Sequence, residues 1–313
     1  MKKSFFKKKT TENTIQNKKI RPNYEYLSTI IGKRILQSRG KTAHVTDGAY
    51  TSVYKGQSMQ MDDLRPYNAG DNIRDIDWKT SSRMGDLVVK NYVSERRKKA
   101  LVIADASCYM SGMMSVKYSK KHAAIITCAT AAFSYEKAGA DFQIITGDEH
   151  TIINVSTGYK NGPAFLEESL CNYEKCFSKN LDNKNEYDVS KLVESCFSNG
   201  LSKTDIVIIS DIYGCRNITD KHLKQLCEAG KYTFFCIDDI ELGQSLIYDV
   251  KKGSKIEDFF CFDNKLRKKL NAKKQEFLND IESRVKHFGG NFVLIKDIQN
   301  ISERIVENLW KYQ

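Results

Sequence analysis

The sequence predicts an α/β protein built on a doubly wound, mostly parallel β-sheet. Two observations predict it: short uninterrupted apolar runs, and helical patterns that separate one run from the next. Strands buried on both faces of a parallel sheet read as continuous apolar runs, and parallel neighbours need crossover connections, which helices supply. A third observation is the length of 313 residues with 41% hydrophobic residues, which suits one such domain with an extension.

The predicted elements begin with an amphipathic helix at 24–40, which we expect to dock on the main domain. Buried strands are predicted at 99–105, 142–146, 206–210, 233–237 and 292–295. Helices are predicted near 115–138, 164–174, 188–198, 217–229, 264–288 and 300–312. Edge or excursion strands are predicted at 150–155, 245–250 and 258–262.

Positive charge gathers at the amino terminus. Residues 1–100 hold 22 of the 50 Lys and Arg residues and 10 of the 39 Asp and Glu residues, so they carry the whole excess of the net charge of +11. Residues 1–21 also lack apolar periodicity and are predicted to be a disordered basic arm. We expect three parts: the arm (1–21), an N-terminal helical and β extension (22–98) and the main domain (99–313).

Other patterns limit the classes of function. No apolar run approaches the roughly 18 residues that span a bilayer, and the amino terminus lacks a signal-peptide core, so we expect a cytoplasmic protein. The nine cysteines form no Cys-x-x-Cys pair and are predicted to be reduced thiols in the core. Glycine-rich phosphate loops are absent, and the five histidines have no Ser or Cys partner at a suggestive spacing.

The stretch from Arg65 to Arg83 surrounds Trp78 with charged residues. Alternation over 73–78 suits a half-buried strand, although so many charges are unusual in one. Two interpretations are open: a charged network that ties the extension to the sheet with Trp78 as its buried anchor, or a docking surface. If the ring is buried, Trp78→Ala should destabilise the fold by about 3 to 5 kcal/mol.

This stretch resembles the signature of the bacterial family called domain of unknown function 58. The residues that carry the resemblance are Tyr67, Gly70, Asp71, Arg74, Asp77, Trp78, Lys79, Arg83, Lys90 and Glu95. The resemblance implies a von Willebrand factor A-like domain, whose sheet is Rossmann-like. It also implies a partnership with MoxR-type AAA+ ATPases, in which the protein is an adaptor for a client protein that the resemblance does not identify.

The resemblance further implies a place for Mg²⁺, held in von Willebrand factor A domains by an Asp-x-Ser-x-Ser triplet, a threonine and a distant aspartate. Asp105 and Ser107 match the first two triplet positions, and Asp211 matches the distant aspartate. We expect the loops after Asp105 and Asp211 to flank the point where strand order reverses, where open α/β sheets bind ligands. Tyr109, however, stands at the second serine position.

The threonine is also missing. Within 185–190, Tyr187 aligns best, and Asp188 or Ser190 could supply an oxygen after a small register change. Two interpretations follow for the strand ends: a degenerate Mg²⁺ site, or aspartates that cap helices and loops.

Three functions remain open. The first is a non-enzymatic adaptor that works with a MoxR-type ATPase, which the lack of a nucleotide loop or nucleophile constellation favours. The second is a Mg²⁺-dependent hydrolase or phosphate-binding enzyme that uses Asp105, Ser107 and Asp211. The third is binding of nucleic acid or an acidic surface through the basic arm, which could equally be a solvated tail.

Overall fold

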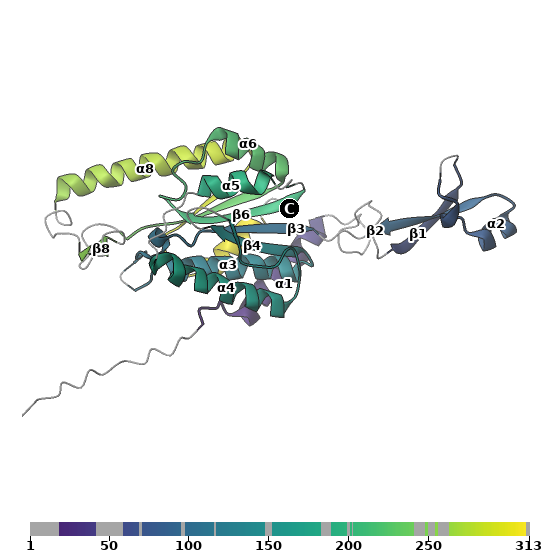
Figure 1. Cartoon of the computed structure of the whole chain (residues 1–313), viewed down its shortest axis with the longest axis horizontal. Coiled ribbons are helices and arrows are strands. Elements are labelled where there is room, and N and C mark those ends of the chain that lie inside the picture. The colour runs from purple at the N-terminus through teal and green to yellow at the C-terminus, as the bar shows by residue number, and fades with distance from the viewer. Residues whose placement is uncertain are drawn as a thin grey trace, which may run out of the picture.

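The chain is represented by a computed structural model with a six-stranded sheet at the centre of the main domain (Figure 1). The structure describes residues 19–41, 59–68, 71–94, 98–115, 117–147, 152–182, 189–198, 201, 203–240, 248–249, 254–255 and 263–310. Residues 1–18 of the predicted arm, and the signature residues Gly70 and Glu95, lie outside these ranges.

The central sheet is mostly parallel, with strand order β10-β7-β6-β3-β4-β5. Its parallel strands are β3 (Lys99–Ala104), β4 (Asp141–Gly147), β6 (Thr204–Asp211), β7 (Tyr232–Ile237) and β10 (Asn291–Ile295), and β5 (Ile152–Asn154) adds an antiparallel edge. Strand β3 pairs with β6 on one side and β4 on the other, with Ala104 opposite Ile209. Strand order therefore reverses between β3 and β6, as predicted.

Helices cover both faces of the sheet, and each face has its own hydrophobic core (Figure 1). One face packs against α1 (Tyr24–Lys41), α3 (Lys120–Lys137), α4 (Pro163–Asp182) and α9 (Ile301–Leu309). The other packs against α5 (Val189–Ser198), α6 (Asp220–Ala229) and α8 (Asn264–His287). The doubly wound α/β fold is thus confirmed, and α4 extends beyond its predicted end at 174.

Strand β3 illustrates why these residues form the centre of the sheet. Ala100 and Val102 face the core that includes α3, whereas Leu101 and Ile103 face the core that includes α5. Because both faces of the strand are buried, its sequence is a continuous apolar run rather than an alternating one. The apolar run was therefore a valid signal for a central strand.

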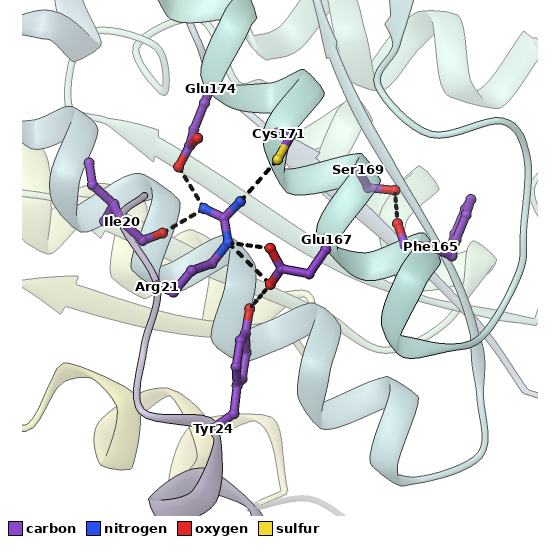
Figure 2. Close-up of polar contacts among 8 residues, drawn as sticks. All are labelled: Ile20, Arg21, Tyr24, Phe165, Glu167, Ser169, Cys171 and Glu174. Carbon is purple, nitrogen blue, oxygen red and sulfur yellow. Dashed lines mark hydrogen bonds and ion pairs between the residues drawn. The ribbon is translucent and has the colours of Figure 1, made fainter. Parts of the chain in front are cut away.

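The segment before α1 is fixed to the main domain by an ion cluster. The Arg21 guanidinium contacts two carboxylates of α4, with Nε 2.9 Å from Glu167 Oε2 and Nη1 2.6 Å from Glu174 Oε1 (Figure 2). The Tyr24 hydroxyl donates to Glu167 Oε1 at 2.9 Å (Figure 2). Beyond them Leu27 of α1 is fully buried in the core. Helix α1 docks on the main domain as predicted, and Arg21, the last residue of the predicted arm, is part of that contact.

The stretch that resembles the family signature lies in a separate small unit, which we call the signature unit (Figure 1). Its elements are the antiparallel strands β1 (Met59–Pro66) and β2 (Val88–Ser94), a 3₁₀ turn, η1 (Ile73–Asp75), and a short helix, α2 (Trp78–Met84). The strand suggested by alternation over 73–78 is therefore wrong. The reason is local: Asn72 caps η1 and Asp77 caps α2, so side-chain caps favour helical turns here.

Three further sequence predictions can be compared with the described residues. A two-residue ladder joins β8 (Tyr248–Asp249) to β9 (Ser254–Lys255), and the predicted segment 258–262 lies outside the description. Most of the cysteines that the structure describes are buried, and all of them are free thiols. Within the described ranges no helix has the length and apolar character that a bilayer crossing requires.

Candidate functional site

Three neighbouring strands end in aspartates at one edge of the sheet. Asp105 follows β3, Asp211 is the last residue of β6, and Asp238 and Asp239 follow β7. Asp105 and Asp211 are fully buried. The carboxyl ends of parallel strands meet at the same edge, so the sheet brings these carboxylates together. We call this group the strand-end site.

Both carboxylate oxygens of Asp105 accept hydrogen bonds from the protein. The Ser107 backbone N–H donates to Oδ1 at 2.7 Å, and the Ser210 hydroxyl donates to Oδ2 at 2.6 Å. Burial, followed by the nearby charge of Asp211, raises the pKa of Asp105 to about 6, against the opposite effect of these hydrogen bonds. Asp105 therefore stabilises the loop that follows it. This agrees with the interpretation that the strand-end aspartates cap helices and loops.

Lys120 places a buried ammonium between two of the strand ends. Its Nζ lies 2.6 Å from Asp211 Oδ2 and 2.5 Å from Asp239 Oδ1, and only 4% of its side chain is exposed. Burial lowers the pKa of Lys120, but the two carboxylates raise it, and the net pKa is above the ordinary value. The ammonium is thus charged, and it compensates the carboxylates of β6 and of the segment after β7.

A second lysine pairs with another carboxylate of this edge, Asp238. Lys274 of α8 forms an ion pair with Asp238, whose Oδ1 also accepts a hydrogen bond from the Asp239 backbone N–H at 2.8 Å. Sequence reasoning overlooked both lysines and this pair of aspartates. One signal was readable, because Asp238 and Asp239 directly follow a predicted strand. Lys120 gave no such signal, because the helix was predicted to begin near 115 and only the structure places this lysine in its first turn.

The loop after β6 closes over the carboxylates. The Gly214 N–H donates to Asp211 Oδ1 at 2.9 Å. A Cβ atom at Gly214 would lie 2.0 Å from Ser210 Oγ and 2.7 Å from Asp105 Oδ2, so only glycine fits at this close approach. The backbone of this loop therefore occupies the space directly against the Asp105–Ser210 pair.

Two tyrosines lie next to the ion pair. The rings of Tyr109 and Tyr213 stack with their centroids 5.6 Å apart, and Lys120 Nζ is 5.9 Å from the Tyr213 centroid. That distance is within the range of a cation–π contact. Tyr109, which takes the place of the second serine, thus belongs to an aromatic pair.

These residues do not fit Mg²⁺. The ion needs about six oxygen ligands, but the carboxylate oxygens of Asp105 and Asp211 already have protein partners, and an ammonium lies against Asp211. Within the described ranges, no group of three or more His, Cys, Asp or Glu side chains is placed to hold a metal. Of the segment 185–190, which contains the three candidates for the missing threonine ligand, residues 185–188 lie outside the described ranges, and Ser190 is buried in the first turn of α5.

In the signature unit, the acidic side chains stabilise local turns. Arg65 forms two hydrogen bonds with Asp71, both of 2.7 Å. Asp77 accepts from the backbone N–H groups of Lys79 and Thr80, each at 3.1 Å, and Lys90 Nζ lies 3.6 Å from its Oδ2. These contacts are all local to the unit, and they stabilise its turns rather than join it to the central sheet. Tyr67 contributes through its backbone, donating to the Leu87 carbonyl at 2.9 Å.

The expectation that Trp78 is a buried anchor is wrong, because 62% of its surface is exposed. Helix α2 is only seven residues long, and its buried residue is Ser81, whose hydroxyl accepts from the Val88 N–H at 2.9 Å. A small polar residue therefore occupies the inner face, and the indole lies outside. Other side chains exposed on the same segment are Ile73, Arg74, Lys79, Arg83, Met84 and Leu87.

Residues 63–227, more than half of the chain, match the model of the family described as "Protein of unknown function DUF58". The chain belongs to this family. No curated protein matches it. Two similar solved structures are a von Willebrand factor type A protein from Catenulispora acidiphila and the VWA domain of SpRpn10. The first has 11% identity and a TM-score of 0.42, over 69% of this chain and 42% of that one. The second has 9% identity and a TM-score of 0.34, over 68% and 95%.

This DUF58 chain thus spans less than half the length of the first of these two structures. The family match contains most of the signature unit together with Asp105, Lys120 and Asp211. Asp239 and Lys274 lie beyond it. Most of the signature unit and the central residues of the strand-end site therefore lie within the family-matched segment. The carboxyl-terminal third of the chain adds further ion pairs to the strand-end site.

Proposed function

We propose that this DUF58 protein is a non-enzymatic adaptor that binds a MoxR-type AAA+ ATPase through its signature unit. The contact surface, which we call the docking face, consists of Ile73, Arg74, Trp78, Lys79, Arg83, Met84 and Leu87. The ATPase would act on a client protein that this chain presents. In this function the chain binds its partners and does not itself catalyse a reaction.

The observation that carries the proposal is the clustering of exposed apolar side chains. Among the residues that the structure describes, eight large hydrophobic side chains are exposed, and four of them lie between Ile73 and Leu87. Single exposed apolar residues are normal on a surface, but a group of them in one segment is typical of an interaction site. A central Trp bordered by Arg is also a common composition for the energetically dominant part of an interface.

The charges that are exposed on the signature unit indicate the kind of partner surface that would bind there. The acidic side chains Asp71 and Asp77 are used within the unit, by Arg65 and by the first turn of α2. The exposed charges are mostly basic, because Asp86 is the one acidic side chain that is exposed among the described residues from 71 to 90. The docking face therefore suits an apolar pocket with an acidic rim on the partner.

The strand-end site offers less support for the enzyme alternative. A hydrolase would need a metal, or a carboxylate free to exchange protons with substrate. Asp105 and Asp211 are instead fully buried and paired with donors from the chain. The third alternative, binding through the basic arm, concerns mainly residues 1–18, which lie outside the described ranges.

An ATPase assay tests the proposal. The probe is the MoxR-type ATPase encoded nearest to the gene of this protein, titrated with the wild-type chain and with the variants Trp78→Ala and Arg83→Glu. We expect the wild type to change ATP turnover saturably. Both variants should need a concentration at least about tenfold higher for the same change, because each removes a residue type that often dominates the binding energy of interfaces. Leu270→Ala, which changes an exposed leucine on α8, is the matched control and should behave as wild type.

Two results would contradict the adaptor proposal. One is the absence of both a complex and any effect on turnover with every MoxR-type ATPase of the source genome. The other is an equal loss in the docking-face variants and in Leu270→Ala, which would indicate a non-specific contact.

A further inference from the structure

We propose that Lys120 is the resident cation of the strand-end site. Its ammonium takes the place that the family resemblance would give to a divalent ion, so the chain itself supplies the cation that pairs with Asp211 and Asp239. Removing the ammonium should create a binding site for a small cation from solution. This inference does not depend on the adaptor proposal.

The geometry is that of a bridging cation. Lys120 Nζ contacts Asp211 Oδ2 at 2.6 Å and Asp239 Oδ1 at 2.5 Å. These carboxylates end one strand and follow the neighbouring one, and Lys120 opens α3. One ammonium thus joins three segments that are distant in sequence, which is what a metal ion bound by separate loops would do.

The position of Lys120 is unfavourable for a lysine unless the two carboxylates require it. Lysine is among the residues least often fully buried, and it is found buried mainly when paired. It also lies in the first turn of α3, where the helix dipole disfavours positive charge. In return, Asp211 is fully buried and would be left without a cation if Lys120 were absent. The pair is therefore reciprocal, and neither charge can be removed alone without a large loss of stability.

The two fully buried carboxylates, Asp105 and Asp211, already have a protein partner on each oxygen. The other oxygen of Asp211 accepts from Gly214 N–H, and both oxygens of Asp105 accept from Ser107 and Ser210. A divalent ion would have to displace the ammonium and also open the loop that Gly214 brings against Asp105. We infer that the cation of this site is fixed, so chelators cannot remove it and added metal cannot replace it.

The test is rescue of a cavity variant. Lys120→Ala removes three methylenes and the ammonium, and we expect it to melt well below the wild type. Propylammonium, which restores the missing atoms, should raise its melting temperature saturably by several degrees at millimolar concentration, as expected for a ligand that binds the folded state. Mn²⁺ should also stabilise it, whereas 1-propanol, which is nearly isosteric but neutral, should not. The wild type should respond to none of the three, and EDTA should leave it unchanged.

A double variant keeps the test decisive if Lys120→Ala folds poorly. Lys120→Met leaves the carboxylates without their cation, and adding Asp211→Asn removes one of the two negative charges. The double variant should therefore melt higher than Lys120→Met alone, although it contains one more substitution.

Three results would overturn the inference. The first is saturable Mg²⁺ binding by the wild type in calorimetry that Asp211→Asn abolishes, which would identify an ordinary metal site. The second is a folded Lys120→Ala that neither propylammonium nor Mn²⁺ stabilises. The third is a double variant that is no more stable than Lys120→Met, which would mean that the ammonium does not compensate Asp211.

Discussion

The strand-end site and the docking face use charge in opposite ways. At the strand ends, Asp105 and Asp211 are buried and every carboxylate oxygen has a partner within the chain. On the signature unit, the acids stabilise turns while basic and apolar side chains face solvent. The comparison teaches that a charged motif alone does not locate a binding surface. What matters is which side chains remain unused after the fold has satisfied its own polar groups.

The largest effect is expected where the backbone closes over the strand ends. Gly214→Ala should destabilise the fold by about 2 to 3 kcal/mol, because its Cβ would overlap Ser210 Oγ inside a packed site. Gly32→Ala on α1 is the matched control, since a Cβ there meets nothing within 4 Å, and it should stabilise the helix by about 0.5 to 1 kcal/mol. Urea unfolding measures both. A neutral Gly214→Ala would show that the strand-end site is open, and the contrast with the docking face would fail.

The next effect concerns pH. The pKa of Asp105 is raised to about 6 in the folded chain, above the usual value of about 3.9. Between these values the folded state holds a proton that the unfolded state releases, so this group makes stability fall as pH rises from about 4 to 6. The loss amounts to at most about 3 kcal/mol.

Asp105→Asn preserves the shape of the carboxyl group and removes its titration. The free energy of unfolding, measured by urea at pH 4.5 and pH 7, should therefore fall less between these pH values in the variant than in the wild type. Equal pH dependence in both proteins would mean that Asp105 titrates normally, and that burial does not dominate the strand-end site.

A smaller effect is expected at the ion cluster before α1, where the comparison can be sharpened with two arginines. Arg21 is largely buried between Glu167 and Glu174, and Arg21→Ala should cost about 1 to 2 kcal/mol. Arg34, which pairs with Glu307 on the surface, is the matched control, and Arg34→Ala should cost at most about 0.5 kcal/mol. Thermal melts compare the two. Similar losses would show that burial does not decide the value of an ion pair in this chain.

The smallest effect on stability is expected on the docking face. Trp78→Ala should change the free energy of unfolding by about 0.5 kcal/mol or less, because the ring is mostly exposed. The other tryptophan, Trp310, packs against the hydrophobic core and is the matched control, so Trp310→Ala should be clearly more destabilising. If Trp78→Ala were the more damaging change, the ring would be a structural anchor after all.

The sequence predicted the strands of the sheet because they depend on local patterns, whereas the switch point was expected from the strand order that the family resemblance implies. Continuous apolar runs identified the central strands, and the aspartates that end them were visible in order along the chain. Lys120 was not predictable in the same way, since its partner Asp211 is 91 residues away and no local pattern reports which lysine reaches it. Trp78 was misplaced for a related reason: large aromatic residues are usually buried, and only the fold reveals that Ser81 occupies the inner face of α2.

The most direct measurement compares the two regions as binding surfaces for the same partner. Calorimetric titration of the MoxR-type ATPase, without nucleotide and with EDTA present, should give the same affinity as titration with Mg²⁺. Trp78→Ala should weaken binding at least about tenfold, while Tyr213→Ala, which changes an exposed ring at the strand-end site, should leave it unchanged. Loss of binding in Tyr213→Ala or in EDTA, together with unchanged binding in Trp78→Ala, would contradict the account.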